Sequence, residues 1–82
     1  MKISVDISLY PLQKAYREPI LAFIEQLAHH SCFEIHYNSM STTVIGEYHQ
    51  IMPILQQALA TTLKATPQSV FIIKLSGGCH PD

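Results

Sequence analysis

Strict alternation of apolar and polar residues predicts the first strand. Between residues 2 and 10 every second side chain is apolar, which is the period of a half-buried β-strand. The apolar set is Ile3, Val5, Ile7 and Leu9. The opposite face then carries Ser4, Asp6, Ser8 and Tyr10. We therefore expect one face of this strand to lie in the core and the other to be polar.

The next segment has the spacing of an amphipathic helix. Apolar residues recur at i, i+3, i+4 and i+7, which places them on one helical face. They are Ile20, Phe23, Ile24 and Leu27. Pro19 suits a first helical turn, where its missing N–H leaves no bond unmade. The pattern predicts a helix that ends at about His30.

The remaining chain reads as strand, strand, helix and strand. Residues 33–38 alternate, and the polar link Asn38-Ser39 leads into a β-branched strand over residues 40–47. A second amphipathic helix is predicted from about Gln50, with Pro53 in its first turn or at a bend. Residues 69–76 are apolar on both faces, and we interpret residues 76–82 as a flexible tail.

This order of elements, βαββαβ, predicts the fold. Each half reads strand, helix, strand, which is typical of the ferredoxin-like α+β sandwich. We expect a single domain over residues 1–82, with a four-stranded antiparallel sheet in the order 4-1-3-2. Both helices should cover one face of the sheet, which leaves the other face open.

Alternation also predicts which side chains the open face carries. If Val44 points toward the helices, its strand turns outward Ser41, Thr43, Ile45 and Glu47. The second strand adds Glu34 and His36. The first and third strands are antiparallel neighbours, so the end of one should lie beside the start of the other. That arrangement brings Ser8 and Tyr10 close to the polar set Asn38, Ser39 and Ser41.

The last strand indicates a partner for the open face. Either Phe71, Ile73 and Leu75 or Val70, Ile72 and Lys74 face outward, and both sets contain bulky apolar groups. An exposed apolar patch marks an interaction surface, and an isologous contact joins the same surface of two copies. A chain of 82 residues also buries little surface by itself. We therefore expect a dimer or tetramer joined through its open faces, with Ile45 and Ile72 at the rim.

Charge and composition exclude several classes of function. The net charge of −1 provides no basic field to attract nucleic acid. No apolar run approaches the roughly 18 residues of a membrane helix. Two cysteines are too few for a secreted scaffold, and the first residues lack a signal-peptide pattern, so we expect a cytoplasmic protein.

Neither a metal site nor a catalytic set is predicted. His29 and His30 are adjacent and would point about 100° apart on a helix. Cys32 and Cys79 lack the spacing of a zinc motif, and we interpret Cys32 as a small buried hydrophobic residue. No nucleophile, base and orienting acid stand out together. We therefore expect a protein that is not an enzyme and has no cofactor.

Three segments carry a resemblance to a known family. They are "ISLYPL", "YREPILAFIEQLA" and "MSTTVIGEYHQIM". Across residues 3–75 the chain resembles the thiamine-binding (YkoF-like) family of small ferredoxin-like proteins. The resemblance implies a sheet-to-sheet homo-oligomer that binds thiamine or its hydroxymethylpyrimidine half without known chemistry, in thiamine uptake or salvage. Many members carry an acidic residue where this chain has Ile45.

The chemistry of such a ligand selects candidate residues on the open face. An aminopyrimidine donates through its amine, and a thiazolium is a flat cation, so the pocket needs a carboxylate, hydroxyls and an apolar or aromatic wall. Asp6 is the strongest candidate, because an acid in a central strand needs a partner once it is covered. The full set is Asp6, Ser8, Tyr10, Asn38, Ser41, Thr43 and Glu47.

Simpler explanations remain open for these residues. Serine and threonine on strands form ordinary cross-strand pairs, and a carboxylate just before a helix complements the helix dipole. Two hypotheses follow from the sequence. One is a binding protein for thiamine or its pyrimidine half, and the other is an oligomeric regulatory or interaction module without a role in thiamine binding.

Overall fold

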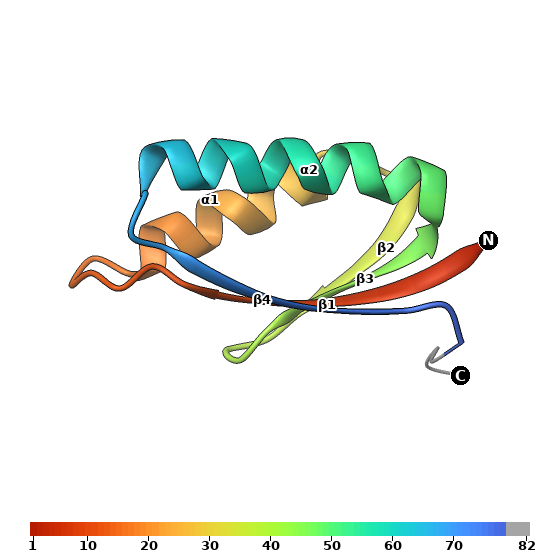
Figure 1. The fold of residues 1–82 in the computed structure, drawn as a ribbon, viewed down its shortest axis with the longest axis horizontal. Coiled ribbons are helices and arrows are strands. Elements are labelled where there is room, and N and C mark those ends of the chain that lie inside the picture. The colour runs from red at the N-terminus through yellow and green to blue at the C-terminus, as the bar shows by residue number, and fades with distance from the viewer. Residues whose placement is uncertain (79–82) are drawn as a thin grey trace.

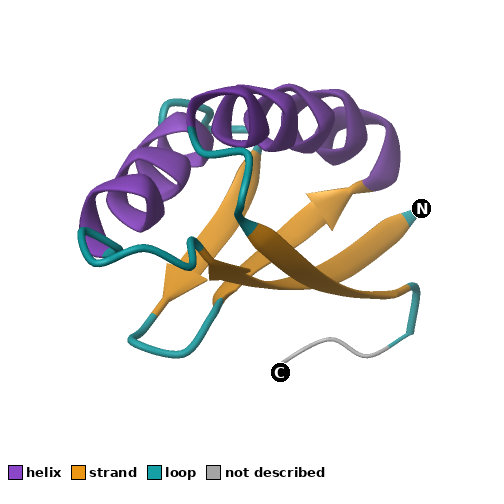
Figure 2. Ribbon diagram, turned by 60° about the vertical axis from the view of Figure 1, so that its left-hand side comes forward, coloured by secondary structure: helices purple, strands orange, loops and turns teal. Residues whose placement is uncertain are grey.

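A computed structural model describes residues 1–78 and confirms the ferredoxin-like α+β fold (Figure 1). The elements are β1 (Lys2–Tyr10), α1 (Arg17–Ala28), β2 (Phe33–Tyr37), β3 (Thr42–Glu47), α2 (Tyr48–Ala65) and β4 (Val70–Ser76). The sheet has the order β2-β3-β1-β4, and every neighbouring pair is antiparallel. Figure 2 shows both helices on one side of the sheet, with the other side uncovered.

The core lies between the sheet and the helices and follows the predicted alternation. Ile3, Val5 and Ile7 of β1 are at most 1% exposed, as is Val44 of β3. They pack with residues of both helices, which are Phe23, Leu27, Ile51, Leu55 and Ala58. Complete burial of each large side chain contributes about 1.5–3 kcal/mol to stability. The inward face of the two central strands therefore supplies much of the core.

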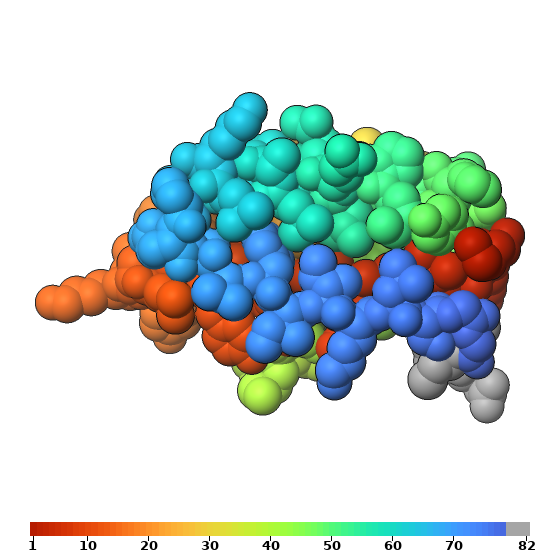
Figure 3. Space-filling model, in the orientation of Figure 1, coloured from red at the N-terminus to blue at the C-terminus, as the bar shows by residue number. Residues whose placement is uncertain are grey.

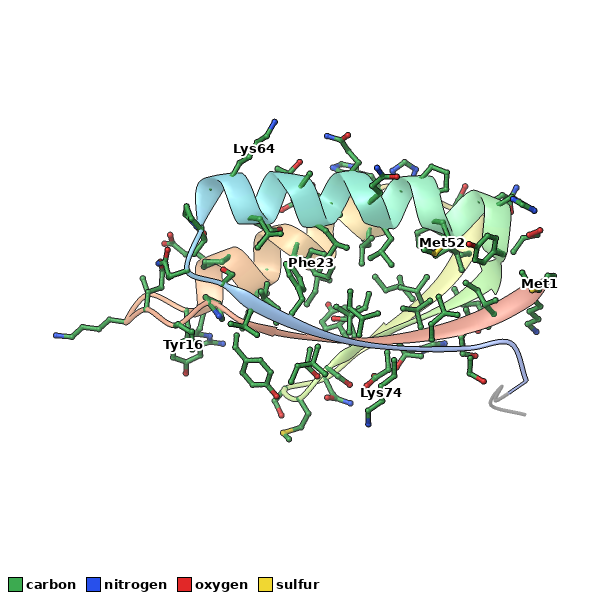
Figure 4. The ribbon with its side chains drawn as sticks, viewed as in Figure 1. Met1, Tyr16, Phe23, Met52, Lys64 and Lys74 are labelled. Carbon is green, nitrogen blue, oxygen red and sulfur yellow. The ribbon has the colours of Figure 1, made fainter. Side chains whose placement is uncertain are left out.

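The orientation of β4 is fixed by an aromatic contact. The ring centroids of Phe71 and Phe23 are 5.1 Å apart, so Phe71 faces the helices. Alternation then places Ile73 and Leu75 on the helix side, and Val70, Ile72 and Lys74 on the open side. Figure 4 shows Phe23 between helix and sheet and Lys74 pointing away from the helices. Ile72 is 51% exposed, so the open face does carry an apolar group.

Both helices depart from their predicted bounds. α1 ends at Ala28 rather than His30, although Pro19 does lie in its first turn. α2 begins at Tyr48 rather than Gln50, because the Glu47 side chain accepts a hydrogen bond from the His49 backbone and starts the helix earlier. Pro53 therefore lies inside α2, beyond its first turn. Because proline has no backbone N–H, it cannot donate the usual helical hydrogen bond to the backbone carbonyl of His49.

The expectations for Cys32 and for the C-terminal segment need correction. Cys32 is exposed, because it lies in the connection between α1 and β2 and its side chain does not enter the core. Ser76 is the last residue of β4 rather than part of a tail. Of the tail predicted over residues 76–82, residues 79–82 lie outside the described part of the chain.

Candidate functional site

The strand register aligns four polar residues in one row across the open face. Asp6 of β1 lies opposite Thr43 of β3 on one side and opposite Lys74 of β4 on the other. Thr43 in turn lies opposite His36 of β2. We call these four residues, Lys74, Asp6, Thr43 and His36, the central polar row. Neighbouring strands are about 4.8 Å apart, so the row spans about 14 Å between its outer Cα atoms.

Asp6 is the half-buried anion of this row. The hydroxyl of Thr43 donates a hydrogen bond to Oδ1 of Asp6 over 3.2 Å. Within residues 1–78 no hydrogen bond or ion pair reaches Oδ2, although Lys74 is the register partner of Asp6. The carboxylate therefore keeps an accepting oxygen for a donor that approaches the open face.

An apolar side chain lies beside the central polar row. Ile45 alternates with Val44, so it lies on the open side of β3, opposite Ser4 and Glu34. It is nevertheless only 3% exposed and does not belong to the core cluster between sheet and helices. The expectation of an exposed Ile45 at the rim of an interface is therefore wrong. Ile72 and Val70 supply the exposed apolar surface of this face instead.

The hairpin between β2 and β3 uses two predicted site residues to hold its own shape. Oδ1 of Asn38 accepts hydrogen bonds from the backbone N–H groups of Met40, at 2.7 Å, and of Ser41, at 3.1 Å. This is the side-chain turn that asparagine commonly forms. The hydroxyl of Ser8 donates to the Met40 carbonyl over 3.5 Å, so β1 does lie beside this hairpin.

Glu47 serves the start of α2. Its carboxylate accepts from the backbone N–H of His49 over 3.2 Å and lies 3.3 Å from the ammonium of Met1. Desolvation raises the pKa of Glu47, but the His49 hydrogen bond and the terminal ammonium outweigh it, so the pKa lies below its usual value. Glu47 is four residues from Thr43, or about 13 Å along an extended strand.

The seven predicted residues therefore do not form one pocket. Asp6 and Thr43 are in contact, and Ser8 lies toward the hairpin end of the open face. Ser41 directly precedes β3 and lines a small hollow together with Ile7 and Phe23 of the core. Tyr10 is opposite Val70, about 13 Å from Asp6 along β1 and away from Glu47. The prediction omitted Lys74 and His36 from the site. Alternation limits the face that each can take, but only the strand register places them beside Asp6 and Thr43.

The described residues, 1–78, contain neither a cluster of metal ligands nor a membrane-spanning helix. No three side chains of histidine, cysteine, aspartate or glutamate in this range are grouped to hold a metal ion. None of the helices there is long and apolar enough to cross a membrane. On the sheet, His36 Nε2 and Glu34 Oε2 are 3.2 Å apart, and both side chains are largely exposed.

Fold and site together define a ferredoxin-like α+β protein with an open, partly polar sheet face. Neither a protein-family model nor a curated protein matches the sequence. A Streptococcus pneumoniae protein of known structure is 22% identical, with a TM-score of 0.87, over 96% of this chain and 89% of that chain.

Two other solved structures have the same fold. A Thermotoga maritima protein, provisionally assigned to thiamine biosynthesis or salvage, is 20% identical with a TM-score of 0.81, over 93% of this chain and 83% of its own. A domain of unknown function from Bacillus cereus is 19% identical with a TM-score of 0.73, over 93% of this chain and 75% of its own. At such identities the likeness shows the fold, which by itself does not define a function.

Proposed function

We propose that this protein binds thiamine, or its hydroxymethylpyrimidine half, on the open face of the sheet and performs no chemistry on it. The observation that carries the proposal is the half-buried carboxylate of Asp6, which has one oxygen without a partner among residues 1–78. The amine of an aminopyrimidine is a suitable donor for that oxygen. The hydroxyl of Thr43 donates a hydrogen bond to the other oxygen of this carboxylate.

Two further observations support this choice of ligand. The sequence resembles the thiamine-binding family in three segments, and one of them contains Thr43. One structure of the same fold carries a provisional assignment to thiamine biosynthesis or salvage. A role in thiamine uptake or salvage is the corresponding proposal for this chain.

Self-association completes the proposed site. The open face is a sheet surface, whereas small-molecule sites are concave and enclose most of their ligand. Val70 and Ile72 are 46% and 51% exposed on the same face, and Ile72 is two residues from Lys74 of the central polar row. A second copy that packs its open face on the first would cover these apolar groups and enclose a ligand at Asp6. We therefore propose a dimer or tetramer as the binding species.

Replacing Asp6 with asparagine tests the proposal. Asn keeps the shape of the side chain and an acceptor for Thr43, but it removes the ionised acceptor offered to the ligand. A charge-assisted hydrogen bond contributes roughly 1.5–3 kcal/mol, so the affinity for thiamine should fall about tenfold to a hundredfold. Titration calorimetry with thiamine and with hydroxymethylpyrimidine measures this change.

The matched control is Glu25→Gln, which removes one carboxylate from an exposed position of α1. It should leave the affinity unchanged. If the parent protein binds neither compound, the proposed function is wrong. If Asp6→Asn binds as tightly as the parent protein, the ligand is held elsewhere.

An oligomeric interaction module without a thiamine role is the second candidate. The exposure of Val70 and Ile72 favours it, because these groups need a covering partner whether or not a ligand is present. The two candidates differ in one result. A protein that assembles through its open face but binds neither compound supports the interaction module.

A further inference from the structure

A hollow on the helix side of the sheet lies apart from the central polar row. It has a volume of about 440 Å³ and lies between the first half of α1 and the end of β2 with its hairpin. Its wall contains Tyr16, Arg17, Tyr37, Asn38 and Ser39, and its apolar part comes from α1. Tyr37 follows His36 on β2 and therefore faces the opposite side of the sheet from the central polar row.

The aromatic residues of this hollow are not part of the core. Phe33 and Ile35 precede Tyr37 on the same face of β2 and pack against the core cluster. Tyr37 itself is 61% exposed, and Tyr16 is 55% exposed at the start of α1. Figure 4 shows Tyr16 at the end of the molecule where the β1–α1 connection meets α1. The two phenol rings are therefore available as walls for a flat ligand.

The charge of the hollow favours an anion. Arg17 is the one charged residue in its wall, and no carboxylate lines it. Among the described residues, no ion pair or hydrogen bond engages the side chain of Arg17, Tyr16 or Tyr37. A guanidinium has a planar set of donors that matches carboxylate and phosphate groups. Asn38 and Ser39 add polar side chains at the hairpin end.

A second hollow extends the first around the end of the molecule. It has a volume of about 370 Å³ and shares Tyr16, Ile20 and Ser39 with the first. Tyr10 and Leu12 line its far side. Leu12 has a φ of 54°, which is a left-handed backbone conformation that costs a leucine about 1–2 kcal/mol. The side chain of Leu12 is 66% exposed. The combined space can hold a ring together with a substituent.

From this combination we infer that the hollow between α1 and the β2–β3 hairpin binds a planar aromatic molecule that carries an anionic group. The ring lies against the phenol walls of Tyr16 and Tyr37, and the anion pairs with the guanidinium of Arg17. The volume falls within the usual range of small-molecule sites, about 300–1,000 Å³. The hollow between α1 and the hairpin is on the opposite face of the sheet from Asp6 and Thr43, the pair on which the proposed thiamine site rests.

Titration of the full chain with phenyl phosphate tests this inference. The chain has no tryptophan, and three of its four tyrosines, Tyr10, Tyr16 and Tyr37, border the two hollows. Intrinsic tyrosine fluorescence and amide NMR shifts therefore report directly on this region. We expect saturable shifts within residues 16–24 and 37–39. Benzylamine, which has a ring but a positive charge, and inorganic phosphate, which has no ring, should each bind at least about tenfold more weakly.

Two charge-removing variants give a matched pair. Arg17→Gln removes the cation of the hollow and should weaken phenyl phosphate binding about tenfold. Lys64→Gln removes an exposed cation from the outer side of α2, as Figure 4 shows, and should leave binding unchanged. Both positions are exposed, so both variants should fold, and the NMR spectrum verifies this. Tyr37→Leu keeps an apolar side chain without the ring and should also weaken binding.

Four results would overturn the inference. One is equal affinity of Arg17→Gln and the parent protein for phenyl phosphate. Another is equal binding of benzylamine and phenyl phosphate. The third is a set of NMR shifts centred on the central polar row, and the fourth is the absence of saturable binding. None of these outcomes depends on whether thiamine binds to the open face.

Discussion

Replacing Gly46 with alanine should destabilise the protein, because a methyl group has no room at this position. Gly46 lies opposite Phe33 of the edge strand β2. A Cβ added at Gly46 would be 2.7 Å from the Cβ of Phe33 and 3.3 Å from its Cα. Carbon atoms in contact prefer about 3.5–4.0 Å. Both obstructing atoms move only with the backbone of β2, so a change of rotamer cannot relieve the clash.

The expected loss follows from two opposing effects. Overpacking of this kind costs about 1–3 kcal/mol, while alanine restricts the unfolded chain and returns about 0.4–1 kcal/mol. β2 has only β3 as a neighbour in the sheet, so it can move by a few tenths of an ångström. We therefore expect a net loss of about 1–2 kcal/mol. For a domain of this size the melting temperature should fall by about 4–16 °C.

Denaturant unfolding at fixed protein concentration measures this loss. Gly77→Ala is the control, because a Cβ at Gly77 would meet no atom within 4 Å, and its effect should stay within about 0.5 kcal/mol. A double-mutant cycle identifies the cause. The cost of Gly46→Ala should largely vanish in a Phe33→Gly background and persist with Phe33→Ala, which keeps the Cβ. Unchanged stability of Gly46→Ala, or an equal cost in both backgrounds, would refute the reasoning.

Two further predictions concern the open face and the start of α2. Ile72→Asp should shift the sedimentation of the protein toward the monomer, because the proposed contact between open faces would bury the unpaired charge of the aspartate. A parent protein that is already monomeric at micromolar concentration would contradict the proposed contact. Glu47→Gln should lower the melting temperature near neutral pH. Folding lowers the pKa of Glu47. The stabilisation that its carboxylate provides is therefore present above the pKa that Glu47 has in the unfolded chain, and it is lost as the pH falls through the pKa that Glu47 has in the folded chain. The melting temperatures of variant and parent should therefore converge in acid, and a constant difference across the pH range would count against the cap.

The sequence alone determined the order of elements and the inward face of the central strands. β1 occupies the predicted range, Lys2–Tyr10, and its alternating residues Ile3, Val5 and Ile7 are buried. Such patterns are informative because burial imposes period 2 on a strand and period 3.6 on a helix. The outward direction of Asp6 and Thr43 followed from the same rule, and they are in contact.

Local sequence could not decide which face of β4 points toward the helices, or that the Glu47 side chain caps α2. Both faces of β4 are apolar, so its orientation depended on the contact of Phe71 with Phe23 of α1. Glu47 is outward by alternation, but α2 begins directly after it and its carboxylate caps that helix. Cys32 is apolar enough for a core, yet its place between α1 and β2 leaves it exposed.

Only the tertiary structure decided which residues share the central polar row. The period of a strand gives the face on which Lys74 or His36 can lie, but their neighbours on that face depend on strand order and register. The hollow lined by Tyr16, Arg17 and Tyr37 arises in the same way, because α1 and the β2–β3 hairpin are distant in sequence and meet only in the folded chain. Alternation in the sequence thus determined the direction of the side chains of the two central strands, and the packing of strands and helices determined their neighbours and the orientation of β4.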